Sequence, residues 1–113
     1  MKQTNFKRGD IYWGDFDLAR GSETKKIRPS IIVSHDLLNQ YSLRVTVAPI
    51  TSQIKKIYWW DYPIKVKGKD AKIMFDQLRV FDKSRLGSFI EHVSLPELKE
   101  IDAVIKKALG LTY

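Results

Sequence analysis

Arg28 is the side chain whose setting most favours chemistry on a phosphate. It follows the polar and charged stretch Gly21 to Ile27 and precedes Pro29, which restricts the backbone of Arg28 towards extended geometry. A guanidinium aimed in this way can donate two parallel hydrogen bonds to phosphate oxygens. The alternative for this stretch, which also contains Glu23, is a solvated loop with a salt bridge.

A second candidate is the sequence Thr51-Ser52-Gln53, which follows Pro49 and Ile50. Hydroxyl and amide groups at the end of a strand are rigidly mounted donors for a phosphate. The same residue types also open turns, because Thr and Ser bond to nearby backbone groups. Both interpretations remain open from the sequence.

A third candidate is the pair Lys55-Lys56, followed closely by Tyr58, Trp59 and Trp60. Cations for the backbone and rings for the bases are the chemistry of a single-stranded nucleic-acid platform, in which stacking contributes ~1–3 kcal/mol per base. Adjacent residues of a strand point to opposite faces. We therefore expect one of Trp59 and Trp60 in the core and the other at the surface or an interface.

The fourth candidate is Asp76-Gln77-Leu78-Arg79, at the end of an apolar run. Its acid and amide are able to bind base edges. An ion pair that closes the barrel is the alternative interpretation.

Composition narrows the class of partner. Twenty Lys and Arg against 13 Asp and Glu give a formal net charge of +7, which makes a polyanion the first partner to consider. The chain has no cysteine, which excludes disulfides, thiolate nucleophiles and cysteine-ligated metals. His35 and His92 are the only histidines and have no carboxylates at metal-ligand spacing, so we expect no metal site and no cofactor.

Length and hydropathy indicate one domain over residues 1–113. The 113 residues are 43% apolar, which suffices for a core, and show no boundary between domains. No apolar run approaches the ~20 residues of a membrane span, and the N-terminus resembles no signal peptide. We therefore expect a soluble, cytoplasmic protein that does not associate with a membrane.

The elements that must position these residues are mostly strands. We expect a strand at 10–16 with a bulge at Gly14, a mobile basic loop at 18–27, strands at 30–34 and 44–50, a helical turn at 36–40, and a hairpin around Lys67-Gly68-Lys69-Asp70. Ser94 and Glu97 form a capping box for a C-terminal helix that Gly110 closes. Five or six short strands and this amphipathic helix predict a small β-barrel packed under the helix.

Five motifs, in order along the chain, resemble those of the MazF/PemK (Kid) toxins of bacterial toxin–antitoxin systems. They are RGDIYW at 8–13, GSE at 21–23, RP at 28–29, PITSQ at 49–53 and DQLRVFDKSRL at 76–86. The resemblance covers nearly the whole chain. It implies a mainly β fold with a C-terminal helix, a small SH3-like barrel of five to seven strands similar to CcdB, and a homodimer. It also implies metal-independent cleavage of single-stranded RNA, and restraint by an acidic, MazE-like antitoxin.

The resemblance implies roles for particular residues. Arg28 would stabilise charge at the scissile phosphate and donate a proton, and Thr51 would contribute a hydroxyl bond. Glu23 is the candidate base or orienter; arginine is a poor base at its usual pKa, but the choice of base between Glu23 and Arg28 stays open. The residues expected to bind RNA are Ser22, Lys25, Lys26, Ser52, Gln53, Lys55, Lys56, Asp76, Gln77 and Arg79.

The chain also departs from the family pattern. Leu18 follows Asp17 where relatives often carry a proline, and the loop after it has no histidine. Two other classes remain as alternatives: a CcdB-like toxin that poisons DNA gyrase without catalysis, and a basic RNA-binding module.

Overall fold

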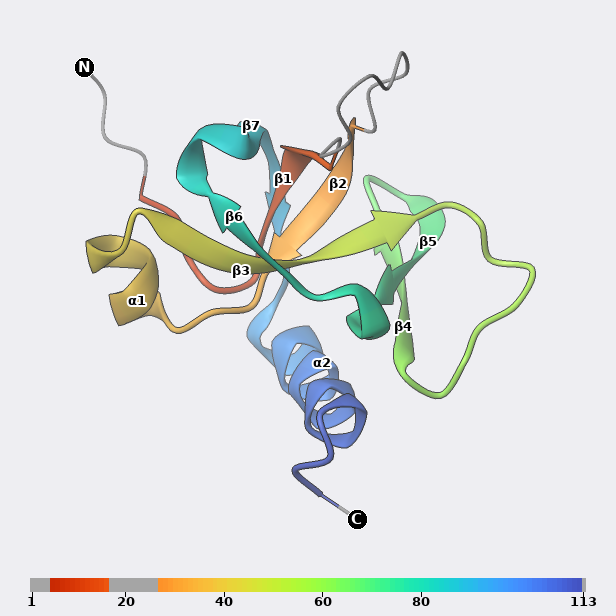
Figure 1. The fold of residues 1–113 in the computed structure, drawn as a ribbon. Helices are drawn as coiled ribbons and strands as arrows, with labels where there is room; N and C mark the ends of the chain where they lie inside the picture. Colours follow the sequence, from red (N-terminus) through yellow and green to blue (C-terminus); the bar gives the residue numbers. More distant parts are fainter. Residues whose placement is uncertain (1–4, 17–26, 113) are drawn as a thin grey trace.

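The structure is a computed structural model that describes residues 5–16 and 27–112. In chain order (Figure 1), its elements are β1 (Asp10–Asp15), β2 (Ile27–Ile32), α1 (Asp36–Tyr41), β3 (Arg44–Thr51), β4 (Asp61–Val66), β5 (Lys69–Met74), the short 3-10 helix η1 (Phe75–Gln77), β6 (Arg79–Asp82), the 3-10 helix η2 (Lys83–Arg85), β7 (Leu86–His92) and α2 (Leu95–Ala108). Within the described residues no helix is long and apolar enough to cross a membrane.

Strand β3 organises the sheet. The strands of the sheet follow the order β4-β5-β3-β2-β1-β7, and β6 pairs with the first half of β3. All of these pairings are antiparallel. Figure 1 shows β3 running across the middle of the molecule, with the β4–β5 hairpin at one end and α1 at the other. The result is the mainly β half-barrel with a C-terminal helix that the sequence predicts.

Residues of β3 pack into two cores. Val45 and Val47 belong to one cluster, with Tyr12, Phe16, Ile32 and Phe81. Ala48 and Ile50 belong to the other, which α2 covers through Ile101. Because successive strand residues point to opposite faces, β3 is buried on both sides for most of its length, and this fixes its path.

The C-terminal helix forms as predicted. Ser94 Oγ accepts a hydrogen bond from the Glu97 amide at 3.2 Å, and Gly110 closes the helix with φ +75°. The helix is held to the sheet by the hydroxyl of Tyr62, which donates to Glu100 at 2.8 Å. Burial, together with Glu100 and Glu97, raises the pKa of Tyr62.

Strand β2 begins earlier than predicted. Ile27 and Arg28 belong to it, because β1 extends alongside as far as Asp15 and pairs Asp15 with Ile27 and Gly14 with Arg28. The expected bulge near Gly14 lies on the opposite strand. From Tyr12 to Gly14, β1 advances two residues while β7 advances three, from Phe89 to Leu86.

Gly14 itself is required for packing rather than for a bulge. A Cβ at this position would lie 2.8 Å from Ser30 Oγ, which is closer than atoms tolerate. The described residues form seven strands, within the five to seven that the family resemblance implies and one more than the chain pattern alone predicts. The extended run that begins after the Gly68 turn is divided by η1 into β5 and β6.

Candidate active site

Arg28 and Thr51 lie at the ends of neighbouring strands. The β2–β3 register pairs Ser30 with Pro49 and Ile31 with Ala48. Continued by two residues, it sets Arg28 opposite Thr51, and both residues border one groove of about 540 Å³. The structure therefore brings together two candidates that are separated by 22 residues in the sequence.

A third residue extends this row. Lys72 of β5 pairs with Thr51 of β3. Side chains directly opposite each other share a face of the sheet, with Cβ atoms about 4.5–5.5 Å apart. Arg28, Thr51 and Lys72 thus form a row across β2, β3 and β5.

The large groove has a lining that the sequence interpretation only partly anticipated. Ser52 and Gln53 border it as expected. Trp13, Lys67 and Lys69 also line it, although the two lysines were interpreted only as part of a turn. Lys67 has φ +51° and Gly68 φ +80°, so this tight hairpin carries two cations to the rim of the groove. The lysines on both sides of Gly68 were the sequence signal that could have identified these two residues as part of a basic groove.

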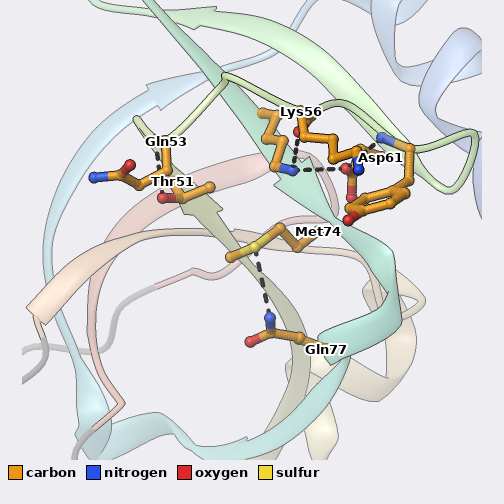
Figure 2. A network of polar contacts seen from close by, with 8 residues as sticks. Thr51, Gln53, Lys56, Asp61, Met74 and Gln77 are labelled. Carbon is orange, nitrogen blue, oxygen red and sulfur yellow. Dashed lines mark hydrogen bonds and ion pairs between the residues drawn. The ribbon is translucent and has the colours of Figure 1, made fainter.

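The turn-opening interpretation of the Thr51-Ser52-Gln53 segment is confirmed, and its role as a phosphate donor stays a prediction. Its Oγ1 accepts a hydrogen bond from the Gln53 amide at 3.1 Å, which opens the turn after β3 (Figure 2). A hydroxyl has one proton to donate as well as two lone pairs. Thr51 is therefore oriented by the turn and retains a donor for a ligand.

A smaller hollow of about 290 Å³ lies on the face of the sheet that carries the Arg28 row. It is lined by Arg28, Phe16, Pro49, Gln77 and Arg79. Arg28 lines both hollows.

Only some residues of the segment 76–79 line the hollows. Gln77 donates to Met74 Sδ at 3.6 Å (Figure 2), and the Arg79 guanidinium lies 5.3 Å from the Phe16 ring. Asp76 is exposed on η1 and lines neither hollow. Among the described residues no ion pair joins Asp76 to Arg79, so the interpretation of this segment as a barrel-closing ion pair is wrong.

The aromatic segment forms a turn rather than a strand. Asp61 holds it by accepting from the Tyr58 amide at 2.9 Å. Strand alternation therefore does not apply, and our expectation that Trp59 or Trp60 is in the core is wrong: Trp59 is 65% exposed and Trp60 is partly exposed. Lys55 and Lys56 are exposed and line neither hollow.

Four of the expected residues cannot be placed. Ser22, Glu23, Lys25 and Lys26 lie outside the described residues. Among the described residues, no group of three or more His, Asp or Glu side chains is arranged to hold a metal ion.

Comparison with known proteins defines the family. Residues 7–109 match the family described as the PemK-like, MazF-like toxin of type II toxin–antitoxin systems. The chain is 36% identical to the endoribonuclease MazF of Staphylococcus saprophyticus, over 93% of this chain and 92% of that protein. The chain therefore belongs to the PemK-like, MazF-like toxin family.

Solved structures share the fold. The crystal structure of MazF from Deinococcus radiodurans superposes with a TM-score of 0.78 at 22% identity, covering 96% of this chain and 99% of that one. A MazE–MazF crystal structure from the same organism gives a TM-score of 0.79 at 21% identity, covering 97% and 100%.

Proposed function

We propose that this chain is the toxin of a toxin–antitoxin pair, an endoribonuclease that cleaves single-stranded messenger RNA without a metal ion and so inhibits translation and growth. The observation that carries the proposal is that Arg28 and Thr51, at the ends of the neighbouring strands β2 and β3, line one groove, and that Arg28 also lines the smaller hollow. The similarity to a staphylococcal endoribonuclease supports the same activity. The site of action is the cytoplasm, where messenger RNA is translated.

The chemistry needs no group beyond the RNA and the protein. The 2′-hydroxyl attacks the adjacent phosphorus, the bond to the 5′ oxygen breaks, and the products are a 2′,3′-cyclic phosphate and a 5′-hydroxyl. Arg28 stabilises the extra negative charge on the phosphorane and, in this proposal, donates a proton to the leaving oxygen. Thr51 donates its hydroxyl to a non-bridging oxygen. Glu23 is our candidate for the base that takes the 2′ proton.

The residues around this pair would guide the RNA. Ser52 and Gln53 in the large groove and Gln77 and Arg79 in the small hollow have donors for phosphates and base edges. Ser22, Lys25, Lys26, Lys55, Lys56 and Asp76 complete the set that we expect to contact RNA, and Lys67 and Lys69 join it from the structure.

We expect the same basic grooves to bind an acidic antitoxin segment, because one electropositive surface attracts both polyanions. One related toxin structure is described as an endoribonuclease in complex with its cognate antitoxin. RNA and an acidic antitoxin peptide should therefore compete for the protein.

We also propose a homodimer. Large apolar side chains remain exposed on α1, on the short segment after it and on β6, among them Tyr41, Leu43 and Val80. Sedimentation at low micromolar concentration should show twice the 13.2 kDa of one chain. A stable monomer would contradict this part of the proposal.

The deciding experiment is cleavage of an end-labelled RNA in EDTA. We expect cleavage to persist, to leave cyclic phosphate ends and to spare an all-DNA oligonucleotide, which has no 2′-hydroxyl. Loss of activity on chelation, restored by magnesium, would disprove the metal-independent mechanism. Binding of RNA without cleavage would favour the RNA-binding module, and inhibition of gyrase would favour the CcdB-like alternative.

A further inference from the structure

The segment between β3 and β4, residues 52–60, is held in place although it contains no regular secondary structure. Lys72 Nζ donates to the backbone carbonyl of Lys56 at 2.6 Å and to Asp61 Oδ2 at 2.8 Å. Figure 2 shows these contacts at Lys56 and Asp61, close to Thr51. The side chains of Lys72 and Asp61 are 9% and 1% exposed. A buried, fully bonded ion pair thus anchors a surface segment.

The same ion pair supports a stack of rings. Lys72 Nζ lies 5.3 Å from the centre of the Tyr58 ring, and Lys56 Nζ lies 5.7 Å from it. The rings of Tyr58 and Trp60 are parallel, with centres 4.6 Å apart. Trp59 contacts Trp60 edge to face at 5.2 Å. The Tyr58 and Trp60 rings therefore form a platform that supports Trp59. This support lowers the entropic cost of holding an exposed indole in position for a ligand.

The position of this stack connects it to the Arg28–Thr51 site. Thr51 and Lys72 are directly opposite each other in the β3–β5 ladder, and the Tyr58 ring covers Lys72. Lys72 thus links the ring stack to the strand position directly opposite Thr51. We expect the base of a nucleotide whose phosphate binds at Arg28 and Thr51 to meet these rings.

We propose that Trp59 is a base-stacking subsite for single-stranded RNA, and that Lys72 is a positioning residue that holds this subsite in register with Thr51. Charge favours RNA as the occupant, because Lys55 and Lys56 flank the rings in a chain of net charge +7. The inference rests on the proposed ribonuclease function for the identity of the ligand. It adds a subsite that would fix which nucleotide lies beside the scissile phosphate.

The test is a binding cycle that does not depend on cleavage. The probe is a short, fluorescently labelled single-stranded RNA with 2′-O-methyl riboses, which cannot be cut. Its affinity is measured for the full-length protein and for Trp59→Ala and Trp59→Phe, and then repeated with one base at a time removed from the probe. Phe89→Ala is the matched control, because Phe89 is an exposed aromatic residue (54%) on β7 that lines neither hollow.

We expect Trp59→Ala to weaken binding about 5- to 150-fold, the range that corresponds to loss of one stacked base. Trp59→Phe should keep most of the affinity, and Phe89→Ala should change nothing. Removal of one particular base should abolish the difference between wild type and Trp59→Ala. Lys72→Met should weaken binding with the same dependence on that base.

Three results would overturn the inference. The first is unchanged RNA affinity of a correctly folded Trp59→Ala protein, as judged by circular dichroism. The second is an equal loss with every abasic probe, which would mean a backbone contact. The third is weaker binding of an acidic antitoxin peptide only, which would make the segment a protein-docking surface. Cleavage by the wild-type protein is scored separately, so failure of the ribonuclease proposal is distinguishable from failure of this one.

Discussion

Two neighbouring regions of this protein position functional groups by different physical means. Arg28 and Thr51 are held by strand ladders, in which each residue is fixed by backbone pairing and by a two-sided core. Residues 52–60 form no strand ladder and are held by a few side-chain contacts centred on the Lys72–Asp61 ion pair. The first arrangement spreads its stability over many contacts, whereas the second concentrates it in a few. Substitutions in the two regions should therefore fail in different ways.

The largest effect should come from the ladder region. Arg28→Ala removes a preorganised cation from the phosphorane, and single-turnover cleavage should fall about 10²- to 10³-fold with the fold intact. Arg28→Lys should recover only part of the rate, because an ammonium lacks the planar fork of the guanidinium. Cleavage by Arg28→Ala at the wild-type rate would place the active site elsewhere, with Asp76 and Arg79 the next residues to test.

The second region should respond in stability. Lys72→Met leaves the buried carboxylate of Asp61 without its cation and should destabilise the protein by about 3 kcal/mol in urea unfolding. The double variant Lys72→Met/Asp61→Asn removes both charges and should recover part of that loss. Equal stability of Lys72→Met and wild type would show that the segment 52–60 has other anchors.

Thr51→Val probes a single hydrogen bond within the ladder region. The valine keeps the shape of the side chain but removes the hydroxyl, and the chemical step should slow about tenfold. Affinity for uncleavable RNA should stay nearly unchanged, since the bond is needed mainly as charge develops. A loss of affinity without a loss of rate at saturation would assign Thr51 to binding alone.

Lys55→Ala and Lys56→Ala probe charge on the second region without disturbing its anchor. Each should lower the slope of log affinity against log salt concentration by about 0.7, as expected for one phosphate contact on a single strand. The single-turnover rate at saturating RNA should change little. A salt dependence identical to that of wild type would mean that these exposed lysines do not contact the backbone.

The smallest effect is expected at Tyr62, which follows Asp61 in β4 and contacts α2. The pKa of Tyr62 is raised above its ordinary value of 10.0, so the unfolded chain loses this proton first as the pH rises. Stability should therefore be full below about pH 10 and decline above it. Tyr62→Phe should flatten that decline in urea unfolding between pH 9 and 11, measured relative to wild type, and should leave RNA cleavage unchanged. An equally steep decline in the variant would assign the effect to other groups.

Local chemistry was sufficient to predict several features. The capping box at Ser94 and Glu97 predicted α2, and the turn at Lys67-Gly68 predicted the β4–β5 hairpin, because both signals act within a few residues. The motifs around Arg28 and Thr51 led to the family, which the comparisons confirm. The roles of the individual site residues stay predictions.

Other features could not be predicted because they depend on residues distant in sequence. The exposure of Trp59 follows from a turn that Asp61 caps and Lys72 anchors, and strand alternation gave the wrong expectation. The break between β5 and β6 and the bulges in β7 likewise depend on partner strands. Lys67 and Lys69 line the groove because of the path that the β4–β5 hairpin takes in the folded protein.

The amino-acid sequence by itself determined the basic charge, the absence of cysteine, the secondary-structure signals and the motifs that carry the family, since these depend on residue type and on short spacing. The tertiary structure decided which of these residues meet. Register across β2, β3 and β5 places Arg28, Thr51 and Lys72 in one row, although they are spread over 45 positions of the chain. Strand register is set by two-sided packing of the whole sheet, a property that no local segment contains.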